Sequence, residues 1–219
     1  MDVDQFWAVV DGARAQAGGD WSAVPEFVTD ALARRPLADI ADFAQIQDEL
    51  EWAAYREDLL TACRLINAGF GSDDGFLYFR DWLLVQGRAA FEAALANPDS
   101  LLDVPGVSAM DPVADDCFAD CEDFLYVANE AWRRVTGAPE LSSSVDKRGH
   151  VSLDPDEVDG LEEELERRGY EARRDEPLPL AGEPIAFKDR DAVFAALPRL
   201  SARFYDQVRG SRRRLMREP

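Results

Sequence analysis

Short stretches of apolar residues at helical spacing, separated by glycine and proline, are the feature that most constrains how this chain folds. In residues 1–97 the stretches end at Gly18-Gly19, before Pro36, at Ala68-Gly69 and before Asn97-Pro98. Apolar residues three and four positions apart line one face of a helix, whereas strict alternation indicates a strand. No comparable run alternates, so residues 1–137 predict an irregular helical bundle and a mainly α fold.

Polar residues before these stretches predict where the helices begin. An Asp or Ser side chain can accept a hydrogen bond from the free N–H groups of a first helical turn. Asp4 and Ser22 are the expected caps of the first two helices. Asp111-Pro112 is a favourable start for a further helix, because proline suits the first helical position. We expect that helix to continue to Gly137.

Residues 138–219 predict a smaller C-terminal appendage, helical or α+β, beside the bundle of residues 1–137. Breakers and small polar residues mark the join between the two parts. The expected elements of the appendage are a linker at 138–152, a helix from Asp154-Pro155, a proline-rich loop or short hairpin around 170–187, and closing helices capped by Asp189 or Asp191.

Charge excludes some classes of protein. The chain of 219 residues carries 44 acidic and 24 basic residues and a net charge of −20, and residues 1–137 hold 26 of the acids and 9 of the bases. A protein that coats nucleic acid or an anionic membrane needs a cationic surface. No apolar run has the roughly 20 residues of a membrane span. A basic protein is the partner that this charge favours, and we expect no direct binding to nucleic acid or membrane.

The common catalytic and cofactor-binding motifs are missing from the sequence. It contains no GxxxxGK[ST], GxSxG or HExxH pattern, and His150 is the single histidine. Three cysteines provide no disulfide framework, and the acidic N-terminus does not resemble a signal peptide, so we expect a cytoplasmic protein. We predict no cofactor and no metal, and leave open whether the protein is an enzyme.

The segment from Gly69 to Gly75 is the most unusual piece of local chemistry. Its glycines widen the range of backbone conformations, and Asp73 and Asp74 precede an aromatic helix that carries Arg80 and Asp81. One interpretation gathers these charged groups around a cation or a basic ligand. The other assigns Ser72, Asp73 or Asp74 to capping of the helix and pairs the arginine with a nearby carboxylate.

A second polar group follows this helix. If the chain turns back at Gly87, Gln86 and Arg88 come close to Asp99-Ser100. An arginine there could hold an acidic ligand through two parallel hydrogen bonds. Alternatively, it could bind a backbone carbonyl or a neighbouring aspartate and fix a loop.

The third candidate is an acidic docking face. No basic residue occurs between Arg88 and Arg133, and the window in between is rich in acids, namely Asp115, Asp116, Asp120, Glu122 and Asp123. On a helix, Asp116 and Asp120 repel each other on one face, which a cationic partner would relieve. Cys117 and Cys121 would share the adjacent face, as buried apolar residues rather than metal ligands.

The run Asp74-Gly75-Phe76-Leu77-Tyr78-Phe79-Arg80-Asp81-Trp82-Leu83, together with Phe6-Trp7 and Gln86-Gly87-Arg88, resembles an uncharacterised bacterial family, common in actinobacteria, defined by a domain of unknown function. The resemblance covers most of residues 1–137 and a short piece at Leu197-Pro198-Arg199-Leu200. It implies no known reaction, cofactor or partner.

Two hypotheses about function follow. The first is a protein-binding or regulatory module, such as an inhibitor or an immunity-like protein, that uses its acidic helical surface. The second is an enzyme or small-ligand-binding protein with a polar pocket built from residues 73–88, which requires those side chains to converge on one concave site.

Overall fold

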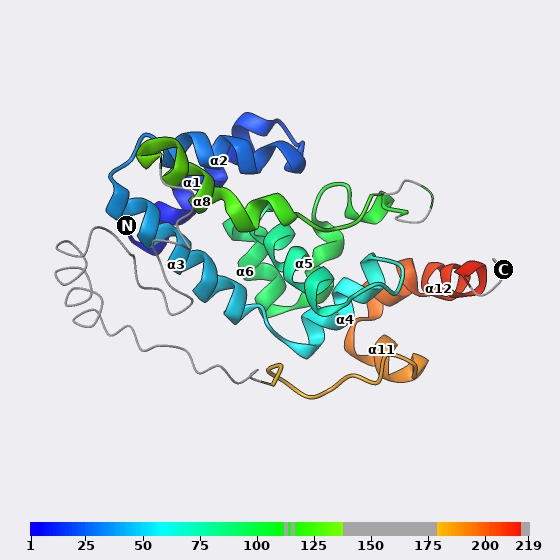
Figure 1. Cartoon of the computed structure of the whole chain (residues 1–219). Coiled ribbons are helices and arrows are strands. Elements are labelled where there is room, and N and C mark those ends of the chain that lie inside the picture. Colours follow the sequence, from blue (N-terminus) through cyan, green and yellow to red (C-terminus); the bar gives the residue numbers. More distant parts are fainter. Residues whose placement is uncertain (112–113, 115–116, 138–178, 216–219) are drawn as a thin grey trace.

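The computed structural model describes residues 1–111, 114, 117–137 and 179–215, and this part of the chain is mostly helical (Figure 1). Its helices are α1 (Val3–Ala17), α2 (Val24–Leu32), α3 (Leu37–Ala53), α4 (Glu57–Ile66), α5 (Asp73–Val85), α6 (Arg88–Ala96), α8 (Val127–Thr136), α11 (Arg190–Ala196) and α12 (Pro198–Leu215). The predicted mainly α fold is confirmed. None of the helices described is long and apolar enough to cross a membrane.

Helix α5 lies in the middle of the molecule and contacts α1, α3, α4 and α6 (Figure 1). Every residue from Phe79 to Val85 is buried. A helix buried on all sides is expected to be apolar all round. Arg80 and Asp81 break this rule. The core therefore contains two adjacent ionisable side chains, and other buried groups must supply their hydrogen bonds.

The helix starts agree with the sequence in part. Ser72 caps α5, because its hydroxyl oxygen accepts a hydrogen bond from the backbone N–H of Gly75 at 3.1 Å. The expectation for Asp4 is wrong, since the cap of α1 is Asp2. The Asp2 carboxylate accepts a hydrogen bond from the backbone N–H of Gln5, and the backbone N–H of Asp2 donates to the Gln5 side chain. The expectation for Ser22 is also wrong, since the helix there begins without a side-chain cap after a short 3-10 helix, η1 (Trp21–Ala23).

The expected continuous helix from 111 to 136 is wrong. Residues 117–121 have no regular structure, and η4 (Glu122–Tyr126), a 3-10 helix, leads into α8. Other elements supply the hydrogen bonds that a helix would have made. The Asn67 side chain bonds to both backbone groups of Ala119, and the backbone N–H of Cys121 donates to the Tyr78 carbonyl at 3.0 Å. Tertiary contacts thus replace helical ones.

The C-terminal helices pack on the bundle. Asp189 caps α11, as one of the two alternatives predicted. Helix α12 contacts α4 and η2 (Pro98–Asp103), and apolar side chains of both closing helices belong to the common core. Ala181 forms an isolated parallel bridge with Arg56. The linker at 138–152, the helix from Asp154 and residues 170–178 lie outside the described residues, and the domain boundary at 137 stays a prediction.

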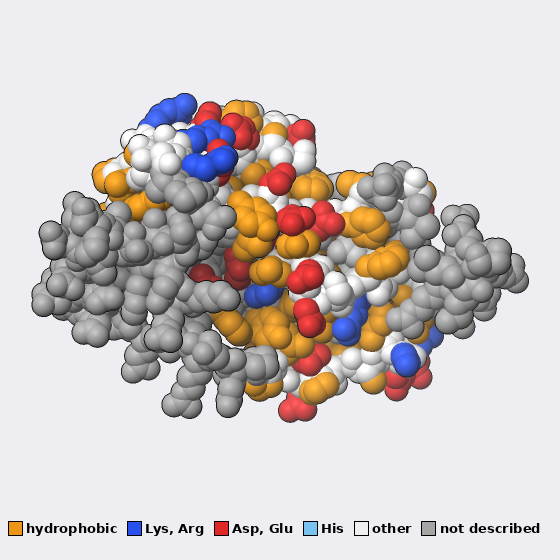
Figure 2. All heavy atoms as spheres, viewed as in Figure 1, with side chains coloured by type: hydrophobic (Ala, Val, Ile, Leu, Met, Phe, Trp, Pro, Cys, Tyr) orange, Lys and Arg blue, Asp and Glu red, His pale blue; other side chains and the backbone are white. Residues whose placement is uncertain are grey.

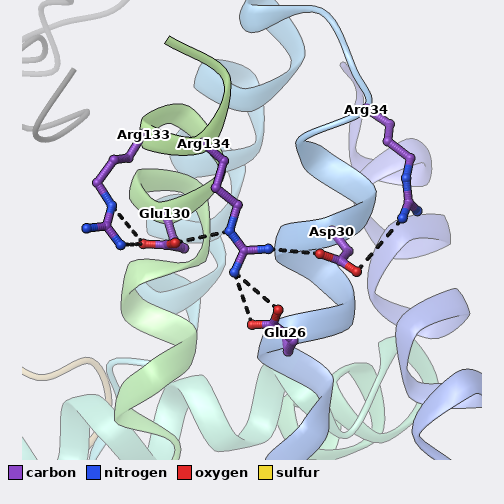
Figure 3. A network of polar contacts seen from close by, with 6 residues as sticks. All are labelled: Glu26, Asp30, Arg34, Glu130, Arg133 and Arg134. Carbon is purple, nitrogen blue, oxygen red and sulfur yellow. Dashed lines mark hydrogen bonds and ion pairs between the residues drawn. The ribbon is translucent and has the colours of Figure 1, made fainter. Parts of the chain in front are cut away.

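An ion-pair network joins α2 and α8 (Figure 3). The guanidinium of Arg134 lies 2.8 Å from Asp30, 3.2 Å from Glu26 and 3.0 Å from Glu130. Arg34 and Arg133 extend it at its two ends. Partly exposed pairs contribute little one at a time. A network nevertheless defines which residues of α8 face α2.

Gly87 allows the chain to reverse between α5 and α6. Its φ of +89° lies in the region that favours glycine, and an added Cβ would lie 2.4 Å from Oδ1 of Asp11. That oxygen accepts a hydrogen bond from the N–H of Arg88 at 3.1 Å. Helix α1 therefore caps α6, and the cap needs a glycine beside it.

We expect Gly87→Ala to lower the free energy of unfolding by about 1–3 kcal/mol, through backbone strain and displacement of the Asp11 cap. Gly12→Ala is the matched control, because Gly12 lies within α1 and nothing is within 4 Å of its added Cβ. The control should stabilise the protein by up to about 1 kcal/mol. Urea unfolding measures both, and a Gly87→Ala variant as stable as wild type would contradict the role of this turn.

Candidate functional site

The six candidate residues around α5 lie in three separate places. Asp73 and Asp74 are exposed in its first turn, where Ser72 already provides the cap. Arg80 and Asp81 are buried in the core. The last two, Gln86 and Arg88, lie at the opposite end of the helix. The structure does not bring these six side chains together in one concave site.

The first turn of α5 adjoins the predicted acidic docking face. The Tyr78 hydroxyl donates a hydrogen bond to Oε1 of Glu122 at 3.2 Å. Desolvation, this hydrogen bond and the nearby carboxylates of Glu122 and Asp74 raise the pKa of Tyr78. Two groups of acids that the sequence treats separately thus form one surface. Asp115 and Asp116, predicted for the same face, lie outside the described residues.

Exposed aromatic rings accompany these acids. Phe70 is 47% exposed and Tyr126 is 49% exposed, and both belong to the few large apolar side chains that the described residues leave exposed. The rings of Phe70 and Phe118 meet edge to face, with centroids 5.6 Å apart. We call this region the acidic–aromatic surface, and define it by Phe70, Asp73, Asp74, Tyr78, Phe118, Asp120, Glu122, Asp123 and Tyr126. In Figure 2 the visible face over α5 shows acidic side chains interspersed with hydrophobic ones.

The carboxylates of the acidic–aromatic surface form no ion pair with any residue that the structure describes. Elsewhere exposed acids do pair with arginines, as Glu26, Asp30 and Glu130 pair with Arg134 in Figure 3. Desolvation, and the nearby Glu122, raise the pKa of Asp120. Arg64 packs against Gly71, with its guanidinium over the Phe187 ring. Within the part of the chain that the structure describes, the surface is therefore a patch of negative charge without a paired cation.

A buried polar cluster lies beneath this surface, and it centres on Gln47. The side-chain N–H groups of Gln47 donate to Oε1 of Glu51 at 3.0 Å, to Oδ1 of Asp81 at 3.2 Å and to the carbonyl of Phe124 at 3.3 Å. All three acceptors are buried. One amide thus joins α3, α5 and η4.

Burial raises the pKa of both carboxyl groups in this cluster. Desolvation, and then the charge of Glu51, raise the pKa of Asp81 well above neutral, and desolvation raises the pKa of Glu51. Oδ2 of Asp81 has no hydrogen-bond partner if both groups are ionised. A proton on that oxygen satisfies it, because it can then donate to Glu51. We assign the proton to Asp81, which is fully buried.

Arg80 is buried in the core, and it donates hydrogen bonds to backbone carbonyls of the chain. Its Nη1 donates to the carbonyl of Glu51 at 2.8 Å, and its guanidinium lies over the rings of Tyr55 and Phe76, 5.1 and 5.3 Å from their centroids. Desolvation lowers the pKa of Arg80, while the carboxyl groups of Glu51 and Asp81 oppose this change. Arginine suits such a position because it stays charged and stacks on aromatic faces.

The far end of α5 forms the second polar group. Arg88 pairs with Asp4 at 2.5 Å and with Glu92 at 2.7 Å, and these hydrogen bonds raise the pKa of Arg88. Two of its three guanidinium nitrogens, Nε and Nη1, thus bind acids of the same chain. Gln86 and Gly87 line a groove of about 830 Å³. Asp99 is buried and accepts from the backbone N–H groups of Arg199 and Leu200, so it fixes α12.

The cysteines do not form the predicted pair. Cys117 is exposed and Cys121 is buried, because the segment that carries them is not helical. Desolvation raises the pKa of Cys121 to about 12. Among the described residues, no three histidine, cysteine or acidic side chains gather as metal ligands would.

Together, the fold and the site define a mainly helical protein in which a buried carboxyl pair lies under an acidic–aromatic surface whose carboxylates form no ion pair with the described residues. The chain belongs to the family described as "Protein of unknown function (DUF4240)", whose model matches residues 1–134. The resemblance to a family with a domain of unknown function is confirmed. No curated protein and no solved structure matches the chain.

Sequence reasoning missed several residues of these sites. Gln47 and Glu51 lie on α3, where acids are frequent and nothing distinguishes buried ones from exposed ones. Tyr78 belongs to the sequence motif on α5, but its hydroxyl bonds to Glu122 and so belongs to the acidic–aromatic surface. Phe70 follows a glycine in a predicted loop, a signal that could have marked it as an exposed aromatic residue.

The shared proton predicts a pH dependence of stability. Above the ordinary Asp pKa of 3.8, the folded protein keeps a proton that the unfolded chain releases. The free energy of unfolding therefore falls as pH rises from about 4 toward the raised pKa, by up to about 1.4 kcal/mol per pH unit. Asp81→Asn should remove this slope, since its amide can donate to Glu51 and accept from Gln47. Urea unfolding between about pH 5 and pH 9 measures the difference.

Glu49→Gln is the control, because Glu49 is an exposed acid on the same helix. Its slope should equal that of wild type. A slope unchanged by Asp81→Asn would contradict the assignment of the proton to Asp81.

Proposed function

We propose that this protein is a binding module whose acidic–aromatic surface docks a basic protein partner, as an inhibitor, an immunity-like protein or a regulator does. One observation carries the proposal. Half-exposed rings at Phe70 and Tyr126 lie among carboxylates that have no cation of the described chain to pair with. Aromatic residues are favoured anchors of protein interfaces. Unpaired charge of one sign favours and steers a partner of the opposite sign.

The rigidity of the surface supports the proposal. The 117–126 segment is fixed to α3, α4 and α5 by hydrogen bonds from Gln47, Asn67 and Cys121. A surface held by its own scaffold loses less conformational entropy on binding than a flexible loop. Irregular structure of this kind therefore presents its acids and rings in one arrangement.

The proposal includes a cytoplasmic location and no nucleic-acid ligand. Free thiols at Cys63, Cys117 and Cys121 fit a reducing compartment. The net charge of −20 disfavours contact with phosphates. The alternative of an enzyme or ligand pocket built from all of residues 73–88 has less support, because the six candidate side chains lie in three places.

Capture from a lysate of the source organism tests the proposal through two matched pairs of variants. Asp74→Asn with Asp123→Asn removes two charges from the surface, and Glu183→Gln with Asp191→Asn removes two exposed charges elsewhere. Tyr126→Ala removes an anchor, and Val135→Ala truncates a comparably exposed apolar residue on α8. We expect the first member of each pair to lose partner about 10-fold or more and the second to retain it.

Retention should also fall as the salt concentration of the wash rises, because the attraction is between exposed charges. A partner held equally by all four variants would place the interface elsewhere. Failure of the wild type to retain any protein at low salt would contradict the proposed function itself.

A further inference from the structure

A groove at the far end of α5 is separate from the acidic–aromatic surface. It lies between α1, α6 and η2 with the two residues that follow η2, Val104 and Pro105, and Gln86 and Gly87 are among the residues that line it. Its volume of about 830 Å³ falls in the range of small-molecule sites. Much of its lining is small side chains, namely Ala15, Gly18, Gly19, Ala89, Ala90 and Ala93. The groove is thus open and largely apolar, with a few polar groups.

Arg14 is the unpaired charge of this groove. Its guanidinium forms no ion pair or hydrogen bond with the residues that the structure describes, and it is only partly exposed. The acids of the groove are engaged elsewhere. Asp11 caps α6, and Asp103 pairs with the guanidinium of Arg199, whose hydrogen bond lowers the pKa of Asp103.

Gln86 adds a hydrogen-bond acceptor. Its side chain is 5% exposed, and its Nε2 donates to the carbonyl of Trp82 at 3.2 Å. A carbonyl only accepts, so the amide nitrogen must face Trp82, and Oε1 is left without a partner among the described residues. This oxygen is not one of the buried atoms that lack a partner, so it is accessible and can accept a hydrogen bond from water or from a ligand in the groove.

We infer that this groove binds a small organic carboxylate that also carries an N–H donor, the chemistry of an amino acid or a short peptide. The guanidinium of Arg14 holds the carboxylate, and Oε1 of Gln86 accepts from the ligand N–H. The hydroxyl of Ser100, which also lines the groove, can serve either role. The small side chains around these groups leave room for the rest of the ligand. The inference does not depend on the proposed function, because no residue of the acidic–aromatic surface takes part.

Backbone amide NMR of the full chain tests this inference with a panel of free amino acids and alanine-containing dipeptides at millimolar concentration. Each is compared with its C-terminal amide, which lacks the carboxylate. We expect at least one carboxylate to shift the signals of Gly87 and Ala90 to saturation. The matching amide should bind the wild type at least about 10-fold more weakly, and so should the same carboxylate with the Arg14→Gln variant. The loss of a charge-assisted hydrogen bond implies this decrease.

Arg34→Gln is the matched control, because Arg34 is an exposed arginine that does not line the groove, and among the described residues it pairs with Asp30. It should bind like wild type. The comparison of acid with amide on the wild-type protein needs no variant to fold. Absence of any shift at Gly87 across the panel, or equal binding of acids and amides, would overturn the inference.

Discussion

The side-chain amide of Gln47 is the interaction on which the centre of this structure depends. It binds two buried carboxyl groups and one backbone carbonyl, and so connects α3, α5 and η4 at a single point. Two adjacent ionised carboxylates at that depth would cost several kcal/mol. A proton shared between Glu51 and Asp81 removes most of this cost. The packing of the central helix and the position of the acidic–aromatic surface both follow from that arrangement.

Helical periodicity was sufficient to predict most of residues 1–97. It fails at residues 117–126 for a physical reason. The apolar residues there, Cys121 and Phe124, do occur at nearly helical spacing, but their backbone is held by partners distant in the sequence. Asn67 and Gln47 supply those partners, and neither carries a signal that a reader of one sequence can attach to residues about 50 and 80 positions away. Tertiary hydrogen bonds override local propensity here.

The candidate site was predictable where it is made of neighbours in the sequence. Asp73 and Asp74 follow a serine cap, and exposure in a first helical turn is the ordinary result. The sequence offered Arg80 and Asp81 as candidates for a ligand site. Both are buried, because other helices surround this part of α5. A charged residue inside an apolar run can be an exposed ligand-binding group or a buried, hydrogen-bonded one. Only the packing of the neighbouring helices distinguishes these two possibilities.

We assign a proton to Asp81 in the folded protein at neutral pH, and the packing of the core around Gln47 depends on it. Carbon-13 NMR of the side-chain carboxyl groups, with Asp81→Asn used to assign the signal, measures this directly. We predict that the Asp81 carboxyl keeps the chemical shift of a protonated acid through neutral pH and titrates only in the alkaline range. Titration near the ordinary Asp pKa of 3.8 would contradict the shared proton and the account of the core that rests on it.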